Sequence, residues 1–118
     1  LAERLYSEGE LFSQAWNFGP SDEDTRSVGT IVEYMANQWG GCATWDIDRS
    51  NQPHEAQLLR LDITKAKCLL GWIPKWDLET ALNSIIEWHQ KMRAGDDMRS
   101  VTLAQMNRYE NTAVKNFE

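Results

Sequence analysis

The stretch QPHEAQLLRLD, residues 52–62, places a histidine beside a glutamate directly ahead of a leucine-rich run. An imidazole and a carboxylate can bind a metal, or can bind the phosphate oxygens and hydroxyls of a polar ligand. A zinc-binding helix of the H-E-x-x-H type needs a second imidazole one turn later, where this sequence has Leu58. The other histidine, His89, lies on the apolar side of a predicted helix, where we expect it to be packed or hydrogen-bonded. The sequence therefore predicts no metal site.

Other catalytic patterns are also missing. The sequence has no G-x-S-x-G elbow, no G-x-G-x-x-G loop and no Walker motif. The acidic run 22–24 lacks the alternating ligands and the positioned glycine of a calcium loop, so we expect a solvated loop there. We predict no catalytic residue and no cofactor-binding residue in this chain. His54 and Glu55 keep two interpretations: they cap a turn, or they form a ligand-facing loop at a sheet edge.

Composition limits the class of protein. With 118 residues, 42% of them hydrophobic and 25% charged, the chain fits a single globular domain in water. The net charge of −6 and the lack of a basic cluster argue against a nucleic-acid partner. No apolar run approaches the roughly 20 residues of a membrane span, and LAERLYSEGE does not resemble a signal peptide. Cys42 and Cys68 are too few for a disulfide framework. We expect a cytoplasmic protein with reduced thiols and no membrane partner.

Hydrophobic periodicity predicts short strands that alternate with amphipathic helices. Apolar residues at every second position predict strands at 14–20, 43–48 and 57–63. Helical spacing predicts helices that end near Gly9, Gly40, Gly71 and Gly95, with Ser27, Thr64 and Asp77 as N-caps, and a last helix from Val101 to about Tyr109. Residues 110–118 are expected to fray. This order indicates an α/β fold whose three strands are too few for a six-stranded nucleotide-binding sheet.

Several strings, in this order along the chain, resemble one family. AWNFGP, a helix that starts SV and ends W-G, PHEAQLLRLD, TKAKCLLGW-P-W and TALNSIIEWH are similar to the C-terminal part of nucleotide-sugar dehydratases, within the extended short-chain dehydrogenase/reductase group. The string D-x-x-K-A-x-x-x-L-G-W-x-P, from Asp62 to Pro74, is general to that group. PHEA, NFGP and DMRSVTLAQ are narrower and resemble the branch that takes a CDP-linked sugar. The likeness runs from Leu1 to about Tyr109.

The resemblance implies that residues 1–118 are the small substrate-binding lobe of such an enzyme, without its Rossmann domain. In the family, that N-terminal domain binds NAD and supplies a Tyr-x-x-x-Lys pair. Here none of Tyr6, Tyr34 and Tyr109 is followed four residues later by a lysine. A fragment of this kind would bind no NAD and would be inactive alone. The family product is a 4-keto-6-deoxy sugar, which feeds dideoxyhexose synthesis for bacterial surface polysaccharide such as O-antigen.

One loop of the family can be carried over residue by residue. Relatives have R-P-G-D or R-P-G-H there, whose arginine contacts the diphosphate and whose last residue contacts the nucleotide. Aligned on Pro53, the arginine position is Gln52, the glycine position is His54 and the last position is Glu55. The resemblance implies Glu55 as a ribose-hydroxyl ligand and His54 as a replacement donor, whereas Gln52 brings no charge to the diphosphate. Arg49 is a further candidate for that charge, because guanidinium matches phosphate geometry.

Two other interpretations stay open. The chain could be the same lobe of another nucleotide-sugar epimerase or dehydratase, or a freestanding interaction module without enzyme activity. The partners that the resemblance implies are a nucleotide sugar and the missing Rossmann domain. Trp16, Trp72 and Trp76 would pack on that domain, and their exposure in its absence predicts self-association.

Overall fold

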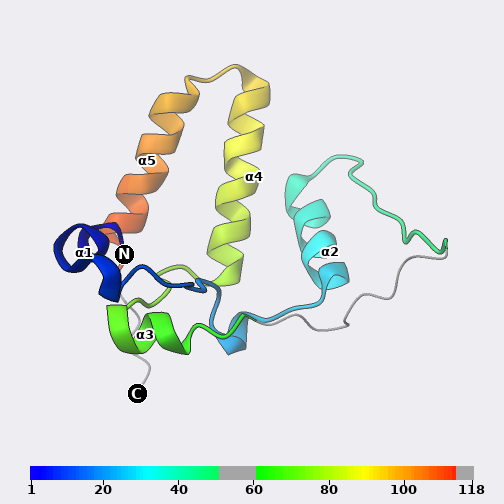
Figure 1. The fold of residues 1–118 in the computed structure, drawn as a ribbon. Coiled ribbons are helices and arrows are strands. Elements are labelled where there is room, and N and C mark those ends of the chain that lie inside the picture. The colour runs from blue at the N-terminus through cyan, green and yellow to red at the C-terminus, as the bar shows by residue number, and fades with distance from the viewer. Residues whose placement is uncertain (51–60, 114–118) are drawn as a thin grey trace.

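Helices make up most of the protein in a computed structural model, which describes residues 1–50 and 61–113 (Figure 1). They hold 61% of the described residues. In chain order the elements are α1 (Ala2–Glu8), η1 (Gly9–Leu11), η2 (Asp22–Asp24), α2 (Val28–Trp39), α3 (Thr64–Leu70), α4 (Leu78–Ala94) and α5 (Met98–Asn111). Among these helices none combines the length and the apolar character that crossing a membrane would require.

The predicted α/β fold is wrong for this part of the chain, because none of the described residues forms a strand. Segment 43–48 has no regular structure. Carboxylates within the segment accept hydrogen bonds from backbone N–H groups of neighbouring residues. The N–H of Ile47 donates to Asp46 Oδ1 at 2.7 Å, and the N–H of Ser50 donates to Asp48 Oδ1 at 2.8 Å. Such side chains offer the backbone a local alternative to a ladder. Alternation supplies an apolar face but no second strand to pair with.

The first predicted strand, 14–20, lies beside the described end of the third, 61–63, and no ladder of backbone hydrogen bonds joins these described residues. Asn17 Nδ2 donates to the carbonyl oxygen of Asp62 at 3.3 Å. This bond runs from a side chain to the backbone, so the two segments touch without the repeated backbone hydrogen bonds of a ladder. Most of the third predicted strand falls within 51–60, which lies outside the described residues.

Capping side chains fix where α2 and α4 begin. Ser27 Oγ and Asp77 Oδ1 each accept the backbone N–H three residues further on, at 3.2 and 2.9 Å. Both predicted N-caps are therefore confirmed. The predicted cap at Thr64 is wrong, because Thr64 is the first residue of α3 itself. Its N–H donates to Asp62 Oδ1 at 2.8 Å, so a carboxylate two residues earlier does the capping.

The turn between α4 and α5 also shows why α5 starts earlier than predicted. Gly95 ends α4 as predicted, and its φ of 84° is a left-handed conformation that glycine adopts without strain. Asp97 then caps the next helix, accepting the N–H of Ser100 at 3.3 Å. α5 consequently begins at Met98, three residues before the predicted Val101. The hydrogen bonds from the Ser100 side chain and from the backbone lower the pKa of the Asp97 carboxyl.

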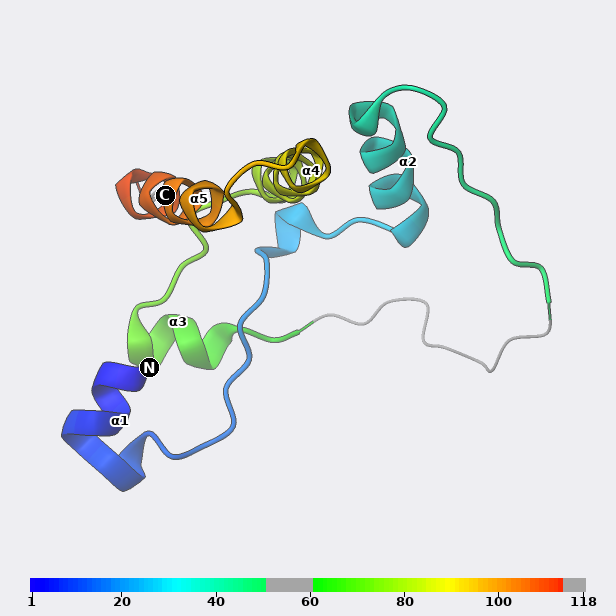
Figure 2. The same cartoon turned by 90° about the horizontal axis from the view of Figure 1, so that it is seen from above.

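α4 lies between α2 and α5 (Figures 1 and 2). On α4, Leu82 and Ile86 are one turn apart and only 8% and 4% exposed, so they form the centre of the apolar core. The contact with α5 is more polar. Gln105 Nε2 donates to the carbonyl oxygen of Ser84 at 2.8 Å.

The predicted apolar face of α4 is only partly correct. Ile85 and Met92 are 46% and 45% exposed, and His89 is also exposed. Of the two expectations for His89, packing among apolar side chains is wrong, because the side chain is exposed. Its ring stands nearly perpendicular to that of Trp88, at 5.1 Å between centroids. α4 thus has one buried apolar stripe and a second one that faces outward.

Aromatic pairs join the extended segments to the helices. Trp16, Trp72 and Trp76 are half-buried rather than exposed, since each has a ring partner within the chain. The partners are Phe12, Phe18 and Tyr109, at centroid distances of 5.8, 5.1 and 5.2 Å. These three tryptophans are therefore not an open apolar surface. Cys42 and Cys68 are both free and exposed.

Truncating Leu82 tests the assignment of the core. We expect Leu82→Ala to lower the free energy of unfolding by about 2–4 kcal/mol, because it leaves a cavity between α4 and α2. Leu103→Ala is the matched control, since Leu103 is a leucine on the neighbouring helix that is 47% exposed. It should cost less than about 1 kcal/mol. Urea unfolding followed by circular dichroism measures both; equal losses would contradict the core described here.

Candidate functional site

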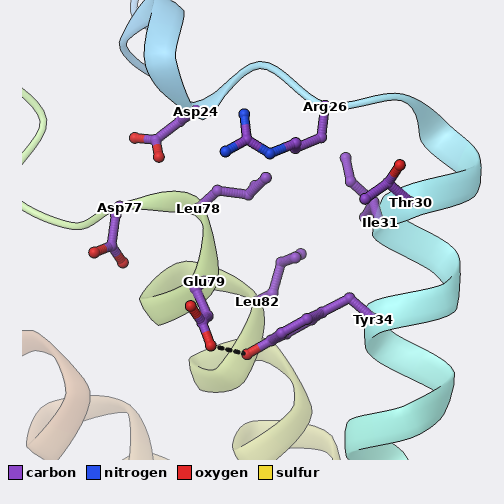
Figure 3. A pocket seen from close by; sticks show the side chains of 9 residues that line it. All are labelled: Asp24, Arg26, Thr30, Ile31, Tyr34, Asp77, Leu78, Glu79 and Leu82. Atoms are coloured by element: carbon purple, nitrogen blue, oxygen red, sulfur yellow. Dashed lines mark hydrogen bonds between the residues drawn. The ribbon is translucent and has the colours of Figure 1, made fainter.

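A cavity of about 240 Å³ lies between η2, α2 and the start of α4 (Figure 3). Ile31, Leu78 and Leu82 form its apolar side. The remaining lining residues are polar: Asp24, Arg26, Thr30, Tyr34, Asp77 and Glu79. Helix capping positions two of these groups, because Asp77 is the N-cap of α4 and Glu79 lies in its first turn.

Tyr34 bridges α2 and α4 at one end of this cavity (Figure 3). Its hydroxyl lies 3.0 Å from Glu79 Oε1 and 3.0 Å from Asn83 Oδ1. Burial raises the pKa of Tyr34, and the hydrogen bond to the Glu79 carboxylate raises it further. The phenol therefore stays protonated at neutral pH and acts as a donor, not as a base.

Arg26 is the one guanidinium on the cavity wall (Figure 3). Its Nη1 donates to two backbone carbonyls of its own loop, at 2.6 and 2.9 Å. Three carboxylates, those of Asp24, Asp77 and Glu79, share the same wall. The balance of charge is negative, so a diphosphate would meet net repulsion there. The cavity suits a neutral polar or a cationic group better than a phosphate.

The arrangement offers binding groups but no catalytic set. The tyrosine is held as a hydrogen-bond donor, and among the described residues no serine, cysteine or histidine lines this cavity. Within residues 1–50 and 61–113, no group of three or more histidine, cysteine, aspartate or glutamate side chains is placed to hold a metal ion.

The residues that the sequence predicts as ligands lie elsewhere. Arg49 is exposed, in the segment that follows α2, and does not line the cavity. Gln52, His54 and Glu55 fall within 51–60, outside the described residues. Whether these four side chains meet one ligand stays a prediction.

Sequence reasoning missed the cavity residues. The acidic run 22–24 was expected to be a solvated loop; Glu23 is exposed, but Asp24 is half-buried and lines the wall, so the expectation is wrong at Asp24. Tyr34 and Glu79 are 45 residues apart, so no local pattern links them. A weak signal existed: Tyr34 follows Ile31 by three residues and so shares its helix face.

The sequence of this chain is similar to that of a known protein over most of its length. No family model matches the chain. The chain is, however, similar to the C-terminal part of a nucleotide-sugar dehydratase. That relative is the CDP-glucose 4,6-dehydratase of Salmonella typhimurium, to which this chain is 45% identical over 109 residues. The match covers 92% of this chain but spans only 30% of the length of the relative. This match confirms the resemblance to the C-terminal part of a nucleotide-sugar dehydratase that the motifs predicted.

The raised pKa of Tyr34 gives a test of the cavity geometry. In Glu79→Gln the carboxylate that disfavours the phenolate is gone, so the pKa of Tyr34 should fall towards the ordinary value of 10.0. Because the folded pKa is raised, the protonated phenol stabilises the fold. That contribution to stability is complete at a pH below the ordinary pKa of the phenol. It is lost as the pH rises through the raised pKa of the folded state. Ultraviolet titration of tyrosinate, with Tyr34→Phe subtracted, measures the shift.

Glu33→Gln is the matched control, because Glu33 precedes Tyr34 on α2 and is exposed, away from the cavity wall. It should leave the pKa of Tyr34 in place. A pKa that is the same in Glu79→Gln and in the unaltered chain would rule out the hydrogen bond between α2 and α4.

Proposed function

We propose that this chain is the C-terminal, substrate-binding part of an NAD-dependent CDP-D-glucose 4,6-dehydratase. The observation that carries the proposal is the 45% identity over 92% of the chain. Under this proposal the whole enzyme makes CDP-4-keto-6-deoxy-D-glucose in the cytoplasm, as a precursor of dideoxyhexoses for surface polysaccharide. The chain alone would be inactive.

NAD belongs to another part of such an enzyme. The sequence has no glycine-rich loop, and the described residues include no strand–turn–helix unit of the kind that holds a dinucleotide pyrophosphate. The residues of this chain therefore do not fit NAD. We assign the cofactor and the catalytic residues to an N-terminal Rossmann domain, as in the family that the motifs resemble.

The substrate is assigned to the loop around Pro53. A glutamate carboxylate accepts two hydroxyls of a diol, which suits Glu55 for the ribose of a nucleotide. His54 can donate to a phosphate oxygen or a ribose oxygen. Arg49, which is exposed and within a few residues of that loop, can supply the positive charge that Gln52 lacks. The negative wall of the cavity between α2 and α4 makes that cavity the less suitable place for the diphosphate.

The role of this lobe in the reaction is then to bind the nucleotide sugar and to enclose its reacting hexose. By holding the nucleotide, it would orient the hexose towards the N-terminal domain, and by covering the cleft it would keep water from the reacting sugar. Self-association of the chain also remains part of the proposal.

A chimera tests the function directly. The part of the Salmonella relative that precedes the matched region is joined to this chain, and conversion of CDP-glucose is measured against UDP-glucose. We expect turnover of CDP-glucose by the chimera and none by the chain alone. Glu55→Ala in the chimera should raise the dissociation constant for CDP about 10- to 100-fold, through loss of charge-assisted hydrogen bonds worth about 1.5–3 kcal/mol.

Glu10→Ala serves as the control, because Glu10 is an exposed glutamate in η1, remote in sequence from that loop. Equal affinity for CDP in the Glu55→Ala and Glu10→Ala chimeras would remove Glu55 from the site. Preference for UDP-glucose would instead assign the lobe to another enzyme of the extended group. A folded chimera that binds neither nucleotide would leave the interaction module as the better description.

A further inference from the structure

α1 carries an apolar face that the described part of the chain leaves open to solvent. At about 100° per residue, Leu1, Leu5 and Tyr6 fall on one side of this helix. Leu1 and Leu5 are each 40% exposed, and Tyr6 is 96% exposed. We call these three side chains the α1 face.

Charged groups border the α1 face without crossing it. The Arg4 guanidinium is paired with the Glu8 carboxylate at the rim and lies 5.6 Å from the centre of the Phe12 ring. Glu3 and Ser7 lie on the opposite side of the helix, where Ser7 Oγ donates to the carbonyl oxygen of Glu3 at 2.9 Å. An apolar centre with a charged rim is the arrangement of a protein interface.

α1 is too short to be stable in water without a cover on this face. It has seven residues, and none of them is buried. Isolated helices shorter than about 12–15 residues are marginal in water, and most helical stability in proteins comes from packing an apolar face. α1 lies at one edge of the molecule, away from α2 and α4 (Figures 1 and 2). The helix therefore needs a contact that the described residues do not supply.

We propose that the α1 face is covered by the polypeptide that precedes this region in a longer protein. This inference rests on the proposed function, in which the chain is a C-terminal part. The Salmonella relative matches this chain with its C-terminal part, which is 30% of its length, so most of a protein of that length precedes the match. Such a polypeptide joins the chain at α1 itself. Its cover is therefore tethered beside the face, at an effective concentration of millimolar order.

A second copy of the chain fits the α1 face less well. Three side chains offer on the order of a few hundred Å², so two copies together bury less than the roughly 1,200 Å² at which standard interfaces begin. A two-fold pairing would also bring two charged α-amino groups of Leu1 to one apolar contact, whereas this nitrogen is an uncharged peptide N–H in a longer protein. Attached polypeptide also loses less translational freedom than a free partner.

Hydrogen exchange of the α1 amides, followed by mass spectrometry, tests this inference. The chain alone, at about 10 μM, is compared with the chimera that carries the preceding part of the Salmonella relative. In the chain alone these amides should exchange within about tenfold of the rate of an unstructured peptide, because a short exposed helix opens readily. In the chimera they should exchange about 100-fold more slowly, because opening then requires the face to be uncovered.

Leu5→Gln in the chimera should speed exchange of the α1 amides about tenfold or more. Glutamine and leucine have similar helix propensities, so the change reports the lost apolar contact and not the helix itself. In the chain alone the same substitution should alter the rate by less than about twofold, because Leu5 has no cover there to lose.

Ser7→Gln is the matched control, because Ser7 is an exposed residue of the same helix on the side away from Leu5. It should leave exchange in the chimera within about twofold. Equal effects of Leu5→Gln and Ser7→Gln would overturn the inference, as would fast α1 exchange in a chimera whose other helices are protected. α1 amides that are already protected in the dilute chain would overturn it too.

Two further outcomes separate the alternatives. Protection of α1 that appears in the chain alone as its concentration rises would assign the face to a second copy and overturn the inference. The exchange measurement needs no nucleotide, so it is independent of turnover. A chimera that protects α1 but does not convert CDP-glucose would support the inference and contradict the proposed function alone.

Discussion

Packing on both sides of α4 is the contact on which the rest of the helical structure depends. Leu82 and Ile86 are buried in its core stripe, while Gln105 and Arg108 of α5 bond to Ser84 and Glu87 on its other side. The cavity towards α2 and a hollow of about 340 Å³ towards α5 are both bounded by this helix. Any change that rotates α4 therefore alters both surfaces together, because one helix positions the side chains of each. The two surfaces are coupled simply because both are built on α4, so no chain of further residues is needed to connect them.

The string from Asp62 to Pro74 contains α3 together with the residues that begin and end this helix. Asp62 accepts the N–H of Thr64 and so caps α3, and Gly71 ends the helix with a left-handed φ of 61°. Lys65 Nζ donates to Gln14 Oε1 and to the carbonyl oxygen of Ala15, and lies 4.5 Å from the centre of the Trp16 ring. The lysine therefore fastens α3 to the segment before η2. The residues of this string therefore start, stop and anchor one short helix.

The helices could be predicted from the sequence because their determinants are local. Ser27, Asp77, Gly71 and Gly95 act within a few residues of their own positions, and periodicity marks the faces between them. The strands could not, because a strand exists only with a partner, and Asp46 and Asp48 satisfy nearby backbone groups instead. The cavity could not be predicted either, because it depends on a contact between residues far apart in the sequence. Tyr34 and Glu79 are 45 positions apart. The ligand loop came from resemblance alone, and local chemistry left its two interpretations open.

The side-chain hydrogen bonds of α4 and of Lys65 on α3 also differ in how many residues of the chain they enclose. Those to α5 join residues 14 to 21 positions apart, whereas those to α2, and those of Lys65 to residues 14 and 15, join positions 45 to 51 apart. Closing a shorter loop costs less entropy and takes less time. The α4–α5 hairpin is therefore the part of this chain best able to assemble early, before α2 or the α3 joint is in place. A nascent or partly unfolded chain would then expose a finished hairpin while the cavity beside it is still unformed.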